Sequence, residues 1–323
     1  MTANLQVFVP GTLEVEDPAD FSLRQSYTKL LQPELVAQGR AKGTFEAYST
    51  ALKKWEEFQP LSPAVAQIKD IHATAWRDAM LEAGFSPATV RKYWRHITAI
   101  FGELIQREII SRPPRCRLPR SRPKLPRLAT HVELDALYDA CRAATWPAIA
   151  DTGVAPSLLW RTFLVLAYNY GPRTRDLWRL PAAGVDWDRE LIRFVAAKTS
   201  KLQGLPFNET VRLHLVKIRQ PREHIFWPTG GNAQFYREWA KINASAGLSA
   251  PLECRDLRET AASNYEAISP GVGSWILGHG PKGITAQFYL NPTPQVLGAV
   301  QQLPQPPSFL HGPSDGCRQR RLF

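Results

Sequence analysis

The chain is poor in cysteine and methionine and has no long apolar run. Its 323 residues include 4 cysteines and 2 methionines. The cysteines are far apart, form no CxxC pair and have no nearby histidine set, so the sequence predicts reduced thiols and no zinc site. No stretch approaches the roughly 18 to 20 consecutive apolar residues of a membrane-spanning helix, and the start of the chain lacks the basic-then-apolar order of a signal peptide. We therefore expect a cytoplasmic protein.

Acidic residues are the minority among the charged side chains. Lys plus Arg number 40 against 29 Asp plus Glu, which gives a formal net charge of +11. Such an excess attracts polyanions over long range, and nucleic acid is the obvious partner. A solvated basic surface that only keeps the protein soluble explains the charge equally well, and an anionic membrane surface would attract the chain too.

The first third of the chain changes character near residue 40. Residues 1–40 carry little periodicity and contain several prolines, so we expect an arm with at most one short helix. Residues 41–111 hold two amphipathic patterns, of which the second begins at Ser86, a good N-cap, followed by Pro87. The sequence predicts a small helical domain here. Its second helix has cations off the apolar stripe that could contact a DNA backbone, although such a face is more often only solvated: Arg91, Lys92 and Arg95.

A basic, proline-rich segment follows, RPPRCRLPRSRPKLPR, residues 112–127. It has seven basic residues, five prolines and no acid. The proline density forbids a regular helix and favours an extended connector, so we interpret the segment as an interdomain linker. Its charges become favourable when they displace counterions from phosphates, and the alternative is a solvated spacer. The candidate DNA contacts in it are Arg120, Arg122 and Lys124.

A second domain is expected over residues 128–303. It begins with the capping-box spacing of Thr130 and Glu133, and the nearly apolar run from Ser157 predicts a buried helix. Alternation in VDWDRELIRFV predicts a β-hairpin, and helical patterns return from about residue 234. The proline-rich residues 304–323 are expected to form a flexible tail.

Four short motifs in this second domain carry the chemistry. The first, GPRTRDLWRL, places Arg173 after a helix-ending Gly-Pro, where a guanidinium could hold two phosphate oxygens or simply face solvent. This motif resembles the first arginine box of the tyrosine recombinases, with Asp176 in the acidic place. The motifs downstream resemble the remaining boxes of that family, in the same order.

The second motif, AAKTSKLQGLPF, resembles the strand-borne lysine of the family. By this resemblance Lys198 donates a proton to the leaving 5′ oxygen, and Lys201 is the near alternative and a further candidate DNA contact. The third motif, LECRDLRETAASNY, resembles the second arginine box, with Arg258 at the expected arginine. Arg255 stands where the family commonly has histidine, and Glu259 stands where a basic residue is common. Arginine stays protonated, so Arg255 can bind phosphate but is no general base.

The fourth motif, SWILGHGPKGITAQFYLNP, resembles the Leu-Gly-His box and the tyrosine that follows it. By this resemblance His279 donates a hydrogen bond to a phosphate oxygen and Tyr289 attacks phosphorus. The spacing between them is one residue longer than usual, and Tyr265 is the fallback nucleophile if that alignment fails. A tyrosine is more commonly a core aromatic, and the ordered set of motifs is what favours the catalytic role.

The resemblance covers roughly residues 41–303 and implies a mostly helical fold with a small β-sheet. A helical SAM-like core-binding domain would precede a mixed α+β catalytic domain, and the two would clamp double-stranded DNA. It implies a site-specific recombinase or integrase that forms a 3′-phosphotyrosyl intermediate and acts as a homo-tetramer on two DNA sites, without metal or cofactor. It also allows an accessory DNA-bending protein and suggests no membrane partner. A catalytically silent DNA-binding relative and a type IB topoisomerase are the alternatives.

Overall fold

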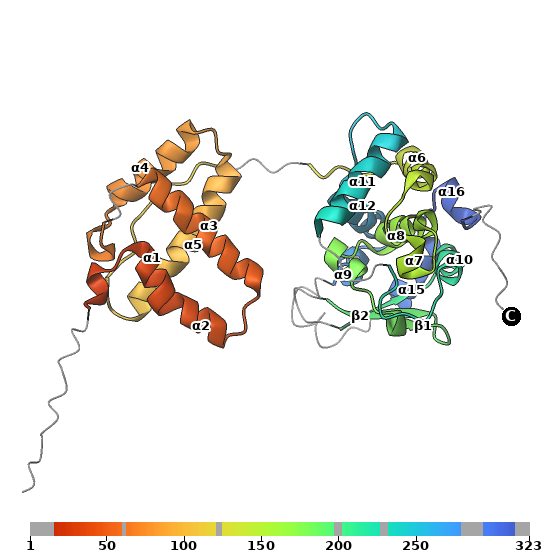
Figure 1. Ribbon diagram of the computed structural model, residues 1–323, viewed down its shortest axis with the longest axis horizontal. Coiled ribbons are helices and arrows are strands. Elements are labelled where there is room, and N and C mark those ends of the chain that lie inside the picture. The colour runs from red at the N-terminus through yellow and green to blue at the C-terminus, as the bar shows by residue number, and fades with distance from the viewer. Residues whose placement is uncertain are drawn as a thin grey trace, which may run out of the picture. The chain divides into compact units, whose positions relative to one another are not determined.

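A computed structural model gives the fold of the chain (Figure 1). It divides into two compact units, residues 1–124 and residues 125–323. In the described part of the chain, no helix has both the length and the apolar composition needed to cross a bilayer. The residues that the structure describes are 16–59, 63–120, 125–196, 202–226, 232–278 and 293–313.

The described residues of the first unit form helices and connecting segments, with no strand among them. Its elements are η1 (Pro18–Asp20), α1 (Leu23–Ser26), η2 (Tyr27–Leu31), α2 (Gln32–Ala37), α3 (Lys42–Phe58), η3 (Val65–Gln67), α4 (Asp70–Glu82) and α5 (Pro87–Gln106). The two predicted amphipathic helices are confirmed as α3 and α5, and the hydroxyl of Ser86 accepts the amide of Thr89 at the start of α5. Both helices bury the apolar faces that their spacing predicts.

Three tryptophans form the centre of the first unit. Trp55, Trp76 and Trp94 come from α3, α4 and α5, and their ring centroids lie 5.7 to 6.5 Å apart. The indole N–H of Trp76 donates to the carbonyl oxygen of Lys54, which satisfies its one polar atom. This aromatic cluster fixes the three longer helices against one another, and it leaves the cations of α5 on the outside.

Residues 18–37 differ from the arm that the sequence predicts. They form four short helical segments, and four of their side chains are buried in the core of the first unit: Leu23, Tyr27, Leu31 and Leu35. These side chains recur every fourth residue, which is one face of a helix. Pro18 begins a helical segment, where a missing N–H costs little. Pro33 lies within an uninterrupted helical run from Leu23 to Ala37, directly after the π turn of η2. The prolines mask the apolar period in the sequence.

The basic, proline-rich segment is docked over its first half. The guanidinium of Arg112 contacts Asp70 Oδ1 at 2.8 Å, and the amide of Arg115 donates to the same oxygen at 2.9 Å. The carbonyl oxygen of Arg117 accepts from the guanidinium of Arg77 at 2.6 Å. The half of the predicted linker that precedes residue 121 is thus attached to α4 of the first unit.

Asp70 is the anchor of this docked half. Its two donors, the Arg115 amide and then the Arg112 guanidinium, lower the pKa of the Asp70 carboxyl. A lowered pKa means that the attachment is present at neutral pH and is lost as the pH falls through that lowered value. We expect Asp70→Asn to speed tryptic cleavage after Arg115 and Arg117 several-fold at neutral pH. The control is Glu46→Gln, which removes an exposed ion pair with Lys42 on α3; equal cleavage rates in both variants would contradict the anchor.

The second unit combines helices with one small sheet. Its elements are α6 (His131–Ala140), η4 (Cys141–Ala143), α7 (Ile149–Thr152), α8 (Pro156–Tyr170), α9 (Thr174–Trp178), η5 (Ala182–Gly184), β1 (Val185–Asp186), β2 (Leu191–Val195), β3 (Leu202–Pro206), α10 (Glu209–Lys217), α11 (Asn232–Ala246), α12 (Cys254–Ile268), α13 (Val272–Ile276), α15 (Thr293–Gln302) and α16 (Pro307–Leu310). The strands pair antiparallel in the order β1-β2-β3, and the predicted hairpin is confirmed as β1 and β2.

Helix α8 is the centre of the second unit, packed against α10 and α12 (Figure 1). Every residue from Leu159 to Tyr170 is buried, which confirms the buried helix expected from the apolar run. The hydroxyl of Tyr170 donates to the carbonyl oxygen of Pro206 at 2.6 Å and ties the end of α8 to β3. The turn after α8 is therefore held in a fixed place between the sheet and α12.

The described part of the expected tail is packed. Phe309 of α16 is fully buried against Tyr138 and Tyr168, with ring centroids 5.2 and 5.8 Å away. The hydroxyl of Tyr168 donates to the carbonyl oxygen of Pro304, and the amide of Ser308 donates to an oxygen of Asp135. Residues 304–313 thus differ from the loose tail that their proline content predicts, because one buried aromatic and two hydrogen bonds offset the entropy of ordering them.

Candidate functional site

The turn after α8 presents Arg173. Gly171 caps α8 with a left-handed φ of +51°, a conformation that glycine adopts without strain. A Cβ built on Gly171 would lie 2.9 Å from Leu277 and 3.1 Å from the Cα of Arg258. Glycine is required here for its φ and for this close approach, and the approach brings the first arginine motif against the helix that carries the second.

Helix α12 supplies the second arginine, Arg258. One guanidinium nitrogen donates to the carbonyl oxygen of Gly171 and the other donates to that of Leu277 at 3.1 Å. Burial and the neighbouring charge of Arg173 lower the pKa of Arg258 to about 10, which leaves the guanidinium protonated at neutral pH. Arg258 therefore joins three of the predicted motifs: it comes from the third and contacts the backbone of the first and the fourth.

The two flanking arginines each face an acid. Arg173 lies 3.7 Å from Asp176, whose carboxylate is buried, and this is the acidic residue of the first motif. Arg255 Nε lies 2.6 Å from Glu259 Oε1, and the Arg255 side chain is 77% exposed. An exposed pair of this kind is held weakly, so Arg255 can exchange Glu259 for a phosphate at small cost.

These three arginines line one cavity. It has a volume of about 580 Å³ and is bounded by the turn after α8, the first turn of α12, the loop before α12 and one face of α11. Arg173, Arg255 and Arg258 are all among its lining residues. Three permanent cations around one cavity could bind a phosphodiester, because guanidinium forks match the spacing of its oxygens.

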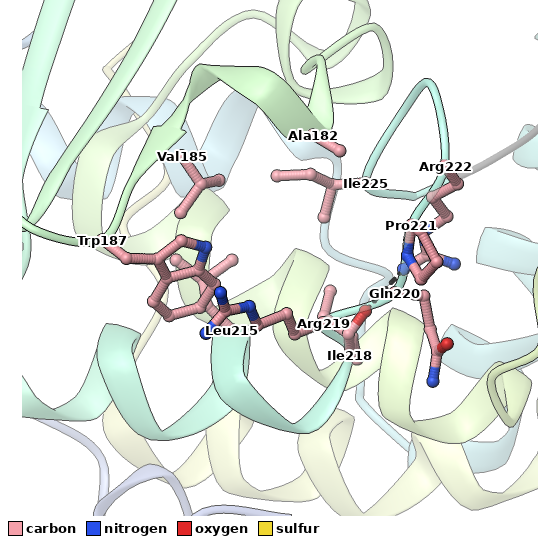
Figure 2. Close-up of a pocket in the computed structure, with 10 residues that line it drawn as sticks. All are labelled: Ala182, Val185, Trp187, Leu215, Ile218, Arg219, Gln220, Pro221, Arg222 and Ile225. Carbon is pink, nitrogen blue, oxygen red and sulfur yellow. Dashed lines mark hydrogen bonds between the residues drawn. The ribbon is translucent and has the colours of Figure 1, made fainter. Parts of the chain in front are cut away.

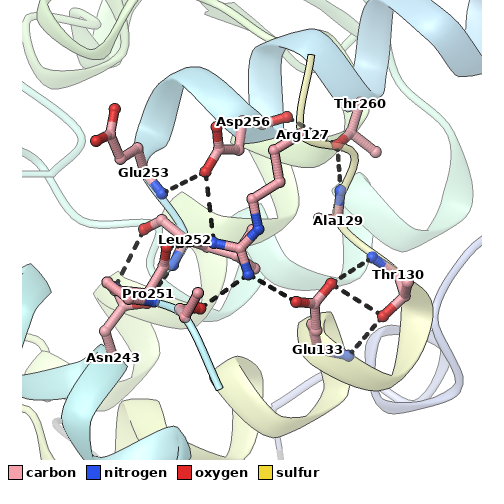
Figure 3. Close-up of polar contacts among 11 residues, drawn as sticks. Arg127, Ala129, Thr130, Glu133, Asn243, Pro251, Leu252, Glu253, Asp256 and Thr260 are labelled. Carbon is pink, nitrogen blue, oxygen red and sulfur yellow. Dashed lines mark hydrogen bonds and ion pairs between the residues drawn. The ribbon is translucent and has the colours of Figure 1, made fainter. Parts of the chain in front are cut away.

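A further arginine, Arg127, secures the first turn of α12 (Figure 3). Its guanidinium lies 2.7 Å from Glu133 and 3.8 Å from Asp256. Two residues later, the amide of Ala129 donates to Thr260 Oγ1 at 2.7 Å, one turn further along α12. This contact could not be predicted from the sequence, because Arg127 lies in the same basic, proline-rich segment as the cations that we expect to face DNA.

Part of the predicted site lies outside the described residues: Lys198, Lys201, His279 and Tyr289. Described residues next to these positions, Gln203 and Gly278, contact one another. A Cβ built on Gly278, whose φ is +67°, would lie 1.3 Å from Gln203 Nε2. Gln203 belongs to β3, which follows the predicted lysines, and Gly278 directly precedes the predicted histidine. The strand of the second motif therefore contacts the turn of the fourth.

The fallback nucleophile is excluded by its surroundings. Tyr265 is fully buried in α12, and its hydroxyl donates to the carbonyl oxygen of Asn169 at 2.6 Å. Burial raises the pKa of Tyr265 far above its ordinary value. A hydroxyl without access to solvent or DNA cannot attack a phosphodiester, so Tyr265 is a core residue.

The predicted DNA-contacting cations of the first unit are exposed where the structure describes them. Arg91, Lys92 and Arg95 are exposed on α5, and Arg120 is exposed in the basic segment. Arg91 also lies 3.4 Å from the carbonyl oxygen of Pro119. The other two predicted contacts of this segment, Arg122 and Lys124, lie outside the described residues.

A second cavity of about 460 Å³ lies between the start of the sheet and the loop after α10 (Figure 2). The guanidinium of Arg219 lies over the ring of Trp187, 4.7 Å from its centroid. Arg222 donates to the carbonyl oxygens of Thr152 and Ile218. The residues that line this cavity include no acid, histidine, serine or cysteine, so they offer no nucleophile or general base. Among the described residues of the whole chain, no group of three His, Cys, Asp or Glu side chains is placed to hold a metal ion.

No family model matches the chain. The chain is 27% identical over 211 residues to a Pseudomonas aeruginosa protein that is assigned as a tyrosine recombinase XerC. The matched region covers 60% of this chain and 48% of that relative. The chain thus spans about half the length of the curated relative that it matches.

Two solved structures share the fold. A lambda integrase tetramer bound to a Holliday junction has 19% identity and a TM-score of 0.66, with 87% of this chain and 80% of that chain covered. The Tn1549 transposon integrase in complex with transposon right end DNA has 18% identity and a TM-score of 0.62, with 87% and 99% covered. The expected fold class is confirmed, and so is the resemblance to the tyrosine recombinases.

Proposed function

We propose that this chain, a relative of the tyrosine recombinases, is a site-specific DNA recombinase or integrase. It would cleave and rejoin double-stranded DNA through a 3′-phosphotyrosyl intermediate. The observation that carries the proposal is the single cavity lined by Arg173, Arg255 and Arg258. These residues lie up to 85 positions apart in the sequence and come from two of the motifs that resemble the family's boxes.

The arginines would stabilise the transition state of phosphodiester cleavage. Negative charge accumulates on the non-bridging oxygens as phosphorus becomes five-coordinate, and preorganised donors lower that barrier. Arg258 is the best prepared of the three, because the carbonyl oxygens of Gly171 and Leu277 hold its guanidinium before any ligand arrives. Arg255 would bind phosphate as a permanent cation in the place of a histidine.

The remaining steps would use residues of the second and fourth motifs that lie outside the described part of the chain. Tyr289 would form a bond to phosphorus while the bond to the 5′ oxygen breaks, and Lys198, or Lys201 in its place, would give that oxygen its proton. His279 would donate a hydrogen bond to a phosphate oxygen. The contact between Gln203 and Gly278 supports this set, because it joins the strand after the lysines to the turn before the histidine.

Assembly follows from the same proposal. The exposed cations on α5 and in the basic segment would hold the DNA backbone, and release of counterions would supply much of the binding free energy. A lambda integrase with this fold is a tetramer on a Holliday junction, which supports a homo-tetramer on two DNA sites for this chain as well. An accessory DNA-bending protein would be a further partner of that assembly.

Covalent trapping tests the proposed chemistry. Duplexes are first selected from a random pool by affinity for the Tyr289→Phe variant, and the chain is then incubated with nicked versions of them and denatured. We expect protein-linked DNA with the unmodified chain and none with Tyr289→Phe, because phenylalanine has no oxygen to bond to phosphorus.

Tyr93→Phe is the matched control, since it removes the hydroxyl of a tyrosine in α5 and should leave the adducts in place. Adducts that persist in Tyr289→Phe would refute the nucleophile. Binding without adducts in any variant would favour the catalytically silent relative, and relaxation of supercoils without site preference would favour a topoisomerase.

A further inference from the structure

The cavity of the three arginines is larger than a phosphate group requires. Its far wall is one face of α11, formed by residues at helical spacing: Tyr236, Trp239, Ala240 and Asn243. Most of its lining surface is apolar, although a phosphate would use only the polar donors at the arginine side. The part of the cavity against α11 therefore suits an uncharged group of a nucleotide next to the phosphate.

Tyr236 is the exposed aromatic side chain of this wall. It is 52% exposed, whereas its neighbours Phe235 and Trp239 are buried. The ring of Phe235 packs perpendicular to that of Tyr236, with 5.1 Å between centroids. Thr174, which directly follows Arg173, lines the cavity together with Tyr236, so the ring and the first arginine border the same space.

The charges around the cavity differ along its wall. Arg173, Arg255 and Arg258 attract one phosphate, whereas the exposed carboxylate of Glu253 lines the same cavity and repels a second. The groups near a phosphate in a nucleic acid are the sugars bonded to it, the bases that those sugars carry and further phosphates along the backbone. The carboxylate disfavours a further phosphate, and the exposed aromatic ring favours a base, because a base has a flat π face to stack on it and a sugar has none.

We propose that this cavity is a nucleobase site, in which the ring of Tyr236 stacks on the base of a nucleotide adjoining the phosphate held by the arginines. That base would leave the stack of the duplex, and stacking on tyrosine would offset the cost of unstacking it. The inference rests on the proposed function for the identity of the phosphate, and it adds a contact that selects the nucleotide beside it.

A mismatch scan tests the site without any cleavage. The Tyr289→Phe variant is titrated with selected duplexes that carry one mismatched pair at each position in turn. A mismatch lowers the cost of extruding a base, so we expect one position to tighten binding by at least about fivefold. Adding Tyr236→Ala should abolish this gain, and adding Tyr236→Phe should keep it, because phenylalanine retains the ring.

The two Tyr236 variants separate stacking from a role of the hydroxyl. If Tyr236 acts only through its hydroxyl, Tyr236→Phe loses the mismatch gain as fully as Tyr236→Ala, and the proposal is overturned. It is also overturned if no position shows a gain, or if Tyr236→Ala keeps it. Thermal unfolding of each variant shows whether the chain remains folded.

The outcome is distinct from that of the proposed function. Failure to form adducts while the mismatch gain depends on Tyr236 would refute the recombinase chemistry and leave the nucleobase site standing. Adducts that form without any Tyr236-dependent gain would refute the nucleobase site and leave the recombinase chemistry standing. With both present, Tyr236→Ala should slow adduct formation on a saturating matched duplex by at least about fivefold.

Discussion

Arg258→Lys is expected to slow covalent adduct formation at least about a hundredfold, the usual cost of losing one preorganised transition-state donor. Lysine keeps the charge but carries all its donors on one nitrogen, so it cannot span the carbonyl oxygens of Gly171 and Leu277 as two guanidinium nitrogens do while also presenting a planar pair of donors to phosphate. The loss should appear in the rate at saturating DNA, because binding depends on many other cations.

Single-turnover kinetics on a trapping duplex measures this rate, with affinity measured in the Tyr289→Phe background. Arg212→Lys is the matched control, since Arg212 pairs with Glu190 and Glu209 on the surface of the same unit. If Arg258→Lys and Arg212→Lys have equal rates, Arg258 does not act on the reacting phosphate. If Arg258→Lys lowers only the affinity for DNA, Arg258 is one DNA contact among several and does not act in the cleavage step.

Phe309→Ala is expected to destabilise the second unit by about 3 to 5 kcal/mol, the cost of removing a fully buried phenylalanine. Its ring fills the space between Tyr138, Tyr168 and His214, and the nearby tail cannot close the void without giving up the hydrogen bonds at Pro304 and Ser308. The substitution therefore tests whether residues 304–313 belong to the core.

Amide hydrogen exchange in α8 measures this loss, because α8 lies at the centre of the second unit and its amides report the opening of that core. Exchange in α5 should not change, since α5 belongs to the first unit. Leu310→Ala removes a neighbouring side chain that is 50% exposed, and it should cost well under half as much. Unchanged protection of α8 in Phe309→Ala would mean that the tail is not part of the core.

The sequence predicts the long helices well because their signals are local. In α5 an N-cap, a first-turn proline and one apolar face agree, and in α8 the apolar run is long enough to exclude a strand. Residues 18–37 and 304–313 have no such agreement. Their segments are short and contain proline, and they are ordered by contacts with residues distant in the sequence. Local periodicity cannot predict that kind of order.

The candidate site also combines residues with a local sequence signal and residues without one. Arg173 and Arg258 were predictable, because each lies in a short motif whose pattern can be compared with a family. Arg127 was not, since its partner Asp256 lies 129 positions away. Tyr236 was missed for a different reason: nothing in the sequence distinguishes an exposed aromatic residue on a cavity wall from one in a core.

The docking of the basic segment has a consequence for the salt dependence of DNA binding. Each phosphate that a cation neutralises adds about 0.9 to the slope of log affinity against log salt. The segment has seven cations, but Arg112 and Arg127 already face carboxylates, which leaves 7 − 2 = 5. While those two ion pairs persist, the segment can add at most about 4.5 to that slope. A steeper contribution would mean that DNA competes with Asp70 or Glu133, and that the chain rearranges its own ion pairs as it binds.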